Sequence, residues 1–235
     1  MTANGVYLQP GFVLQHRHYR ETSVILDVLT QDHGRVSVLA KGVRKAKSKM
    51  AGLLQPFVPL KLSYVGHSEL KLLTHAEMDS PATPLTGLAL YCGFYVNELV
   101  SRFLHPHDPH PEVFLGYRAC LAQLADQQAL EMALRLFELE LIGHSGYGLQ
   151  LDYDFYHGQP VEPDKKYHFD AEQGPVAAEQ GAFSGLTLQA MSRKDFTHPQ
   201  VLNEAKLLMR SVINTHLQGR SLKSRTVINQ LIKQR

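Results

Sequence analysis

The sequence has no tryptophan, only two cysteines and no apolar run long enough to cross a bilayer. Cys92 and Cys120 lie within apolar helical patterns, so we expect reduced thiols, and two cysteines provide neither a disulfide framework nor a thiolate zinc site. The N-terminus lacks the cationic and apolar regions of a signal peptide, and no stretch reaches the ~18 apolar residues of a membrane-spanning helix. We therefore expect a soluble cytoplasmic protein without membrane contact, metal or other cofactor.

The chain also lacks a large surplus of one charge, since its formal net charge is only +2. This total conceals a pattern. Residues 1–80 contain 10 basic and 6 acidic side chains (net +4), residues 81–199 contain 7 and 15 (net −8), and residues 200–235 contain 7 and 1 (net +6). Basic ends around an acidic middle suggest that the ends contact nucleic acid, while the middle serves scaffolding or protein contacts.

The first 80 residues have the pattern of short strands separated by turn signals. We expect strands at residues 6–15, 22–30, 35–41, 57–65 and 69–76. Five short strands with an insertion after the third match a small closed barrel of the oligonucleotide-binding (OB) type, which commonly binds single-stranded nucleic acid. A five-stranded SH3-like barrel would give nearly the same pattern.

A dense run of cations follows the third expected strand and contains no acidic residue. Small residues between these cations would let a backbone approach a ligand closely. A solvated basic loop between two buried strands suits contact with a phosphate backbone, whereas an ordinary lysine-rich loop would only aid solubility. We expect nucleic-acid contact from this loop and from the cation at the start of the third strand, that is, from Arg35, Lys41, Arg44, Lys45, Lys47 and Lys49.

The pattern changes to helical spacing after residue 81. Thr83 and Pro84 are typical of an N-cap followed by proline at the first helical position. Further helices are expected at residues 112–126, 128–142, 187–191, 201–217 and 226–232, with a small exposed hairpin inserted near residues 149–183. The sequence thus predicts an α+β protein with a barrel domain at residues 1–80 and a helical domain at residues 81–235.

Two other segments could carry chemistry. His105, His107 and His110 could hold a metal and support a metal-dependent hydrolase, but three prolines within residues 105–111 favour an exposed connector. A second basic segment contains Arg220, Lys223 and Arg225. It is either a solvated turn between helices or an extension of the nucleic-acid surface, and we include its three cations among the candidate contacts.

Long stretches of the chain resemble one family, the bacterial DNA repair proteins called RecO. The barrel is similar in YRETSVILDVLTQDHGRVSVLAKGVRKAKS and LLQPFVPLKL, and the helical part in LYCGFYVNELVSRFL, ALRLFELELIGHSGYGL and GRSLKSR. The resemblance covers most of the chain. It departs in one place, because many RecO proteins carry a four-cysteine zinc module after the GYG turn, whereas residues 149–178 contain no cysteine. A metal-free hairpin is expected in its place.

The resemblance implies a recombination mediator, not an enzyme. It implies binding to single- and double-stranded DNA, annealing of complementary strands, and, with RecR, help for RecA on DNA coated by single-stranded DNA-binding protein (SSB), in the cytoplasm at the nucleoid. An OB-fold protein that binds RNA or the ribosome is the alternative that composition would permit.

The resemblance also implies a receptor for the SSB tail, which is acidic and ends in apolar residues and a free carboxylate. Such a receptor needs an apolar groove with a cation at its edge. We expect Arg135, on the most apolar helix, to supply this cation, with Arg102 as the second choice. Alternatively, Arg135 pairs only with Glu131 or Glu138 on its own helix.

Overall fold

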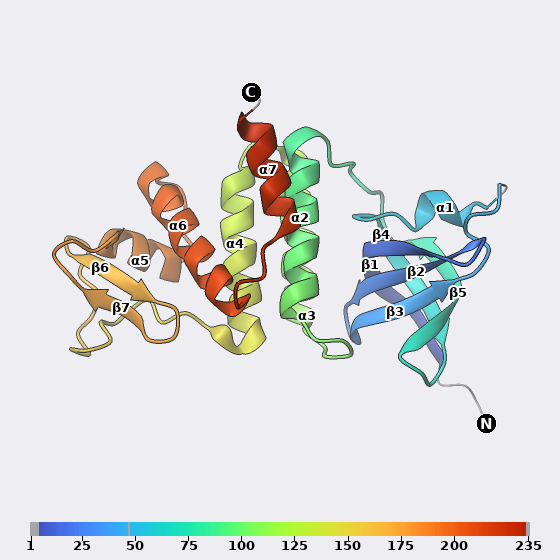
Figure 1. The fold of residues 1–235 in the computed structure, drawn as a ribbon, viewed down its shortest axis with the longest axis horizontal. Helices are drawn as coiled ribbons and strands as arrows, with labels where there is room; N and C mark the ends of the chain where they lie inside the picture. The colour runs from blue at the N-terminus through green and yellow to red at the C-terminus, as the bar shows by residue number, and fades with distance from the viewer. Residues whose placement is uncertain (1–4, 47, 234–235) are drawn as a thin grey trace.

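The computed structural model describes residues 5–46 and 48–233, which form a β-barrel, a group of helices and a small sheet (Figure 1). The helices lie between the barrel and the small sheet, so the expected α+β class is confirmed. No helix in these described ranges is both long and apolar enough to cross a membrane.

The barrel is closed in the strand order β1-β2-β3-β5-β4. All five expected strands are present, although β1 is one residue longer at its start and four at its end. β3 pairs in parallel with β5, β1 pairs with β4, and a short helix lies between β3 and β4, which is the OB-type arrangement. The elements are β1 (Gly5–Tyr19), β2 (Ser23–Thr30), β3 (Gly34–Ala40), α1 (Met50–Leu53), β4 (Pro59–Val65) and β5 (Leu70–Met78).

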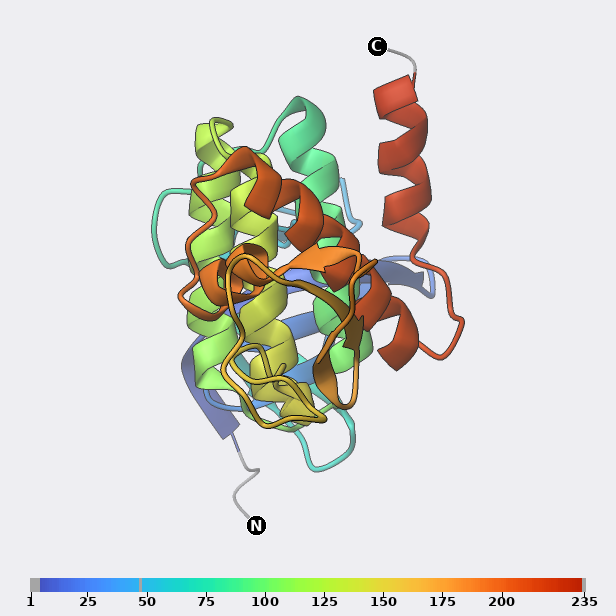
Figure 2. The same cartoon turned by 90° about the vertical axis from the view of Figure 1, so that its left-hand side faces the viewer.

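The remaining elements follow the expected order. A π-helical turn, η1, directly follows α4, and the expected hairpin of β6 and β7 gains β8 as a third strand in the order β7-β6-β8. Figure 2 shows α7 standing beside the other helices. The elements are α2 (Gly87–Phe103), α3 (Pro111–Asp126), α4 (Leu130–Ile142), η1 (Gly143–Tyr147), β6 (Lys166–Asp170), β7 (Gly174–Ala177), β8 (Phe183–Ser184), α5 (Gly185–Ser192), α6 (Pro199–His216) and α7 (Lys223–Lys233).

The start of α2 differs from the expectation at Thr83 and Pro84. Residues 81–86 are not helical, and the N-cap of α2 is Thr86. Leu85 is buried, and a Cβ on Gly93 would lie only 2.7 Å from its Cδ1 atom. Tertiary packing of Leu85 against α2 therefore keeps this segment outside the helix. We propose this linker as the boundary between the two domains.

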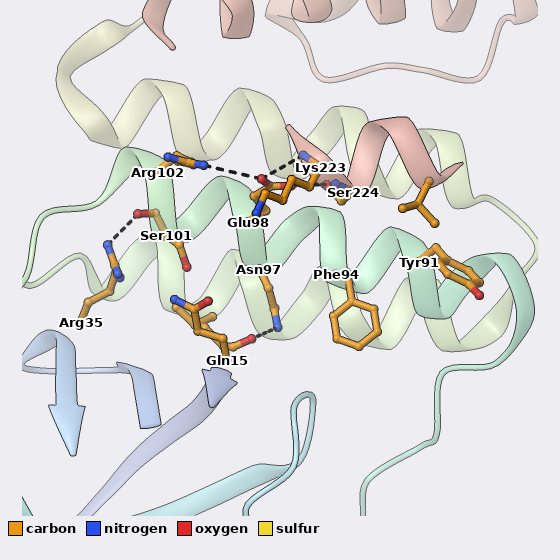
Figure 3. Close-up of a pocket in the computed structure, with 12 residues that line it drawn as sticks. Gln15, Arg35, Tyr91, Phe94, Asn97, Glu98, Ser101, Arg102, Lys223 and Ser224 are labelled. Carbon is orange, nitrogen blue, oxygen red and sulfur yellow. Dashed lines mark hydrogen bonds and ion pairs between the residues drawn. The ribbon is translucent and has the colours of Figure 1, made fainter. Parts of the chain in front are cut away.

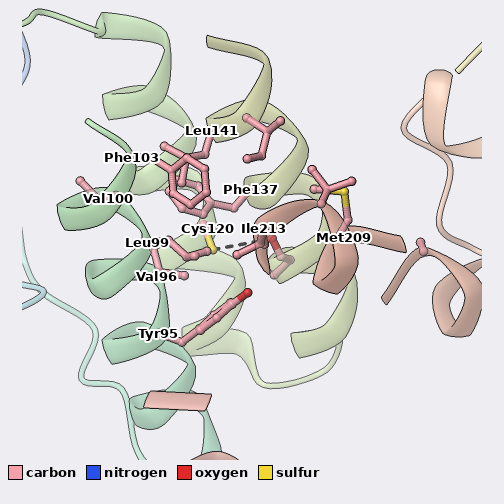
Figure 4. Packing of buried hydrophobic residues seen from close by; sticks show 14 of the residues in the cluster. Tyr95, Val96, Leu99, Val100, Phe103, Cys120, Phe137, Leu141, Met209 and Ile213 are labelled. Carbon is pink, nitrogen blue, oxygen red and sulfur yellow. Dashed lines mark hydrogen bonds between the residues drawn. The ribbon is translucent and has the colours of Figure 1, made fainter. Parts of the chain in front are cut away.

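Two apolar clusters form the core, and β1 contributes to both. Val13 lies inside the barrel, whereas its neighbours Phe12 and Leu14 lie on the outside against the helices, as the alternation of a strand requires. The Phe12 ring lies 5.6 Å from that of Phe114 and 5.1 Å from that of Tyr117. The cluster that contains Phe12 and Leu14 continues between the helices and forms the core of the helical part (Figure 4).

Polar contacts fix the barrel at the end of α2. The Arg35 guanidinium donates from Nη1 to the carbonyl oxygens of Ser101 and Leu104, both at 2.8 Å, and pairs from Nη2 with Asp27 at 2.6 Å. The last carbonyls of a helix have no partner within the helix, so a cation placed there is stabilising. In addition, Asn97 donates to the Leu14 carbonyl at 2.7 Å.

The Arg35 contacts generate a stability prediction. Arg35→Gln should lower the free energy of unfolding by ~3 kcal/mol, because it leaves Asp27 without its cation and the α2 carbonyls without their donor. Urea denaturation measures this loss. Arg17→Gln, at an exposed cation on β1, is the matched control and should change stability little. Equal stability of the two variants would contradict the assigned role of Arg35.

Candidate nucleic-acid interface and neighbouring grooves

The basic loop, residues 41–49, leaves the barrel between β3 and α1. Lys41, Arg44, Lys45 and Lys49 are exposed, and none of these four pairs with a carboxylate among the residues that the structure describes. The fifth cation expected here, Lys47, lies outside the described residues. The loop therefore presents at least four free positive charges at one end of the barrel.

The base of this loop is anchored to the barrel. Val43 is buried with the barrel core, and the Arg44 amide donates to the Thr22 carbonyl at 2.9 Å. The Arg44 guanidinium also approaches the carbonyl oxygens of Arg20 and Glu21, at 3.5 and 3.2 Å. Arg20 is exposed and thus becomes a neighbour of the basic loop that sequence reasoning missed. Consecutive antiparallel pairing of β1, β2 and β3 was the signal that could have placed the β1–β2 turn beside this loop.

Arg35 requires a correction, because its guanidinium is committed to Asp27 and to the end of α2. Its side chain is only 14% exposed. We therefore remove Arg35 from the candidate nucleic-acid contacts and assign it to the joint between the barrel and the helices.

The three C-terminal cations lie on the α6–α7 turn and on α7, away from the basic loop (Figure 1). Arg220 and Lys223 are exposed. Arg225 is held by two neutral groups, since its Nη1 atom donates to Asn214 at 2.7 Å and its Nη2 atom lies 3.3 Å from the Tyr95 hydroxyl. Arg220 and Arg225 line hollows of the helical part, and Lys223 lines a cleft between the helices and the barrel, so these cations do not form one patch with the basic loop.

A groove, here called the tail groove, runs between α2, α4, α6 and α7 and encloses about 190 Å³. The residues that line it present mainly apolar surface, and one of them, Leu207, is 60% exposed. The charged groups in it are four cations and two acids. The residues that carry the argument are Leu88, Leu130, Leu134, Leu207 and Ile228 among the apolar ones, and Arg135, Lys206, Arg210, Arg225, Glu131 and Glu138 among the charged ones.

Both acidic residues of the tail groove form ion pairs with cations of the same groove. Arg135 forms an ion pair with Glu138, and Lys206 pairs with Glu131 at 2.6 Å. The Tyr95 hydroxyl donates to Glu138 at 2.7 Å, and burial, reinforced by the charge of Glu138, raises the pKa of Tyr95 far above its usual value. Of the two alternatives for Arg135, the structure contains the pairing within its own helix. Arg135 still lines the groove, but its charge is neutralised.

Arg210 and Arg225 are the cations of this groove that no carboxylate neutralises within the described residues. Both also line an adjoining hollow of about 330 Å³, together with Arg220 and several neutral polar side chains. The tail groove thus has an apolar end and a cationic end. Sequence reasoning missed Arg210. The periodicity of α6 indicates only that this side chain lies on the polar face of the helix, and it does not indicate which groove that face borders.

Arg102, the second choice for the tail, lies on a different face of α2. It lines a cleft between α2, α7 and the barrel, where its guanidinium is 3.9 Å from Glu98. Glu98 also accepts hydrogen bonds from the Lys223 amide at 3.1 Å, from the Ser224 amide at 2.9 Å and from the Ser224 hydroxyl at 2.6 Å. The carboxylate of α2 therefore caps the first turn of α7. Arg102 is removed from the candidate tail groove.

The histidine connector is docked against the barrel. The His107 amide donates to the Arg35 carbonyl at 2.9 Å, and a Cβ on Gly34, whose φ is +63°, would clash with the Asp108 backbone. His110 contacts Asp108 at 3.1 Å. Throughout the part of the chain that the structure describes, no three His, Cys, Asp or Glu side chains are placed to share a metal ion.

A buried carboxylate organises residues 149–178. Asp154 accepts from the His157 amide and contacts the His157 ring, both at 2.7 Å, and it accepts from the Ala177 amide at 2.6 Å. Burial alone would raise the pKa of Asp154, but these hydrogen bonds outweigh it and hold that pKa below its usual range. Asp154 thereby connects the loop before β6 to the end of β7.

Comparison with known proteins covers nearly the whole chain. Residues 2–81 match the family model described as Recombination protein O N terminal, and residues 84–226 match Recombination protein O C terminal. The DNA repair protein RecO of Methylococcus capsulatus is 47% identical over 222 residues, which cover 94% of this chain and 92% of that protein. The corresponding protein of Nitrosococcus oceani is 41% identical over 231 residues, with coverages of 96% and 94%, and that of Shigella flexneri is 40% identical, with coverages of 97% and 96%.

The cap on α7 generates a pH prediction. Burial would raise the pKa of Glu98, but the hydrogen bonds from Ser224 and Lys223 outweigh it, so the pKa lies below its usual value. A carboxyl with a lowered pKa in the folded state stabilises above its unfolded pKa of ~4.3 and loses this effect as the pH falls through the folded value. Glu98→Ala should therefore cost ~1 kcal/mol in urea denaturation at pH 7.

The difference between the parent and Glu98→Ala should shrink as the pH falls below ~4.3. Glu179→Ala, at an exposed carboxylate without a hydrogen-bond partner in the described residues, is the control. A difference that stays constant down to acid pH would exclude a charged cap.

Proposed function

Because the chain belongs to the RecO family of DNA repair proteins, we propose that it binds single- and double-stranded DNA, anneals complementary strands and, with RecR, helps RecA onto DNA coated by SSB. It acts in this proposal by binding and placing strands, not by breaking bonds. Two features of the molecule support it, namely the basic loop and the tail groove, and each serves a different partner.

The basic loop is the observation that carries the DNA-binding proposal. Its described cations, Lys41, Arg44, Lys45 and Lys49, are exposed and have no acidic partner within the described residues, so binding a phosphate backbone breaks no internal ion pair. The neighbouring Arg20 widens this surface. Contacts of this kind neutralise phosphates without reading bases, which suits a protein that must accept any sequence.

The tail groove is our proposed receptor for the SSB tail. Apolar side chains such as Leu134 and Leu207 would take the apolar end of the tail. The guanidiniums of Arg210 and Arg225 would bind its carboxylates, because guanidinium binds carboxylate in a bidentate manner. Arg220 would extend the cationic end towards the acidic part of the tail. Arg135 contributes to the floor of the groove through its pair with Glu138, and we no longer propose it as the main carboxylate ligand.

The DNA-binding proposal predicts a weaker salt dependence in a loop variant. Replacing Arg44, Lys45, Lys47 and Lys49 by alanine should weaken binding of single-stranded DNA with little sequence preference. The slope of log affinity against log salt should fall by ~0.7 for each phosphate that the variant no longer neutralises. Fluorescence anisotropy at several salt concentrations measures both effects.

The matched control replaces four exposed cations outside the basic loop, Lys165, Lys166, Arg193 and Lys194, by alanine and should leave the slope unchanged. An unchanged slope in the loop variant would remove the loop from the DNA site. Competition with RNA of the same length tests the alternative that the partner is RNA, and preference for RNA would favour that alternative.

The tail proposal predicts separate effects on peptide and DNA. Arg210→Ala should weaken binding of a peptide that is acidic and ends in apolar residues with a free carboxylate by about tenfold, as expected when one charge-assisted hydrogen bond is removed. Affinity for bare DNA should stay nearly the same. Isothermal titration calorimetry with the peptide and anisotropy with DNA measure the two affinities.

Arg118→Ala, at an exposed cation on α3, is the control for net charge and should bind the peptide like the parent. Amidation of the peptide's C-terminal carboxylate should weaken binding to the parent more than to Arg210→Ala. The assignment fails when Arg210→Ala binds the peptide as tightly as Arg118→Ala does.

A further inference from the structure

A large cavity lies at the joint between the two domains. This interdomain cleft encloses about 570 Å³ and is lined by β1 and β3 of the barrel, by one face of α2 and by the start of α7 (Figure 3). It is separated from the tail groove by α7 and uses a different face of α2, since Leu88, Cys92 and Tyr95 line the tail groove. Neither the basic loop nor the tail groove accounts for it.

One face of α2 carries two aromatic rings into the cleft. Tyr91 and Phe94 are spaced by three residues and therefore lie on the same side of the helix. Phe94 is 43% exposed, and Figure 3 shows its ring on the side of α2 that faces the barrel. The Phe57 ring packs against this ring in an edge-on arrangement, with 5.1 Å between the ring centroids. A partly exposed aromatic ring that a neighbour holds in place can stack with a flat group.

The other end of the cleft is cationic, although residues 81–199 as a whole have a net charge of −8. Three cations, Arg35, Arg102 and Lys223, and one acid, Glu98, line the cleft, but Arg35 is already paired with Asp27, so the other three groups have a net charge of +1. The charge of Glu98 is used by the amides and hydroxyl that it caps on α7. Lys223 has no carboxylate partner within the described residues, whereas Arg102 lies 3.9 Å from Glu98, so Lys223 is the cation most available to an anionic ligand.

We infer that the interdomain cleft binds unpaired DNA, with bases stacked on Phe94 and Tyr91 and phosphates near Lys223 and Arg102. This inference rests on the proposed DNA-binding function and adds a second contact to the basic loop. Base–aromatic stacking together with cations along the backbone is the usual way to hold a single strand without reading its sequence. A duplex does not fit this chemistry, because its bases already stack on one another and hide their faces.

The cleft also gives Lys223 a place in the DNA surface that the basic loop alone does not provide. Lys223 belongs to α7, yet it faces the same cavity as Gln15 of β1. A strand in this cleft would contact both domains at once. The basic C-terminal segment would thus contribute one cation to DNA through Lys223, while Arg220 and Arg225 line the tail groove or its adjoining hollow.

The test separates stacking from charge. Phe94→Leu keeps an apolar side chain against Phe57 but removes the aromatic face. Its affinity for an oligothymidine strand should fall at least about fivefold, whereas its affinity for an abasic strand of the same length should not change. The salt slope should equal that of the parent, because the variant retains every cation. Phe155→Leu, at a ring that is 48% exposed near the small sheet, is the matched control and should bind both strands like the parent.

Two outcomes would overturn the inference. In the first, Phe94→Leu binds both strands like the parent. In the second, its affinity falls equally for both, which would mean that bases are not involved. If thermal denaturation shows that Phe94→Leu is unfolded, Tyr91→Leu is tested with the same two strands, and the same two outcomes apply to it. The quadruple variant of the basic loop is read independently, so failure of the cleft and failure of the DNA-binding proposal are distinguishable.

Discussion

The arrangement of the whole molecule depends on the guanidinium of Arg35, which joins the barrel to the last carbonyls of α2. This contact satisfies backbone groups that a helix leaves without partners, and it holds the cation against Asp27 at the same time. Apolar contacts of Phe12 with Phe114 and Tyr117 provide area but little direction, whereas the hydrogen bonds of Arg35 and Asn97 fix the angle. With that angle fixed, the interdomain cleft has a defined width, and α2 presents one face to the cleft and another to the tail groove.

The cations of the chain have separate roles in the structure. The cations of the basic loop have no acidic partner in the described residues, Arg35 is used within the fold, and Arg135 and Lys206 are paired with acids of the same groove. Arg210 and Arg225 are left to face the apolar walls of the tail groove. The basic C-terminal segment thus places positive sites beside the acidic middle region, and these sites act locally because Coulomb interactions are strongest over a few ångströms and are screened beyond them.

The sequence predicted the barrel well because alternation of apolar residues and turn signals are local properties. It located all five strands, and the exposed cations between β3 and α1 lie where the pattern placed them. It misplaced the start of α2, since local cap signals at Thr83 and Pro84 yielded to the packing of Leu85 against Gly93. It could not distinguish Arg35 from the loop cations, because a strand pattern does not say which helix end lies opposite. For Arg135 it offered two partners, and only the fold, which buries the helix face with Glu138, decides between them.

Helix α7 is the common wall of two grooves, with Lys223, Ser224 and Val227 lining the interdomain cleft and Arg225, Ile228 and Asn229 lining the tail groove. It is attached through the Glu98 cap and the contacts of Arg225, and Figure 2 shows it standing beside the other helices. Thermodynamic linkage gives this geometry a definite consequence. Any occupant of one groove that favours one position of α7 over another changes the affinity of the other groove, and the second occupant acts back on the first by the same factor. Through this one helix, occupants of the two cavities would be thermodynamically linked without touching each other.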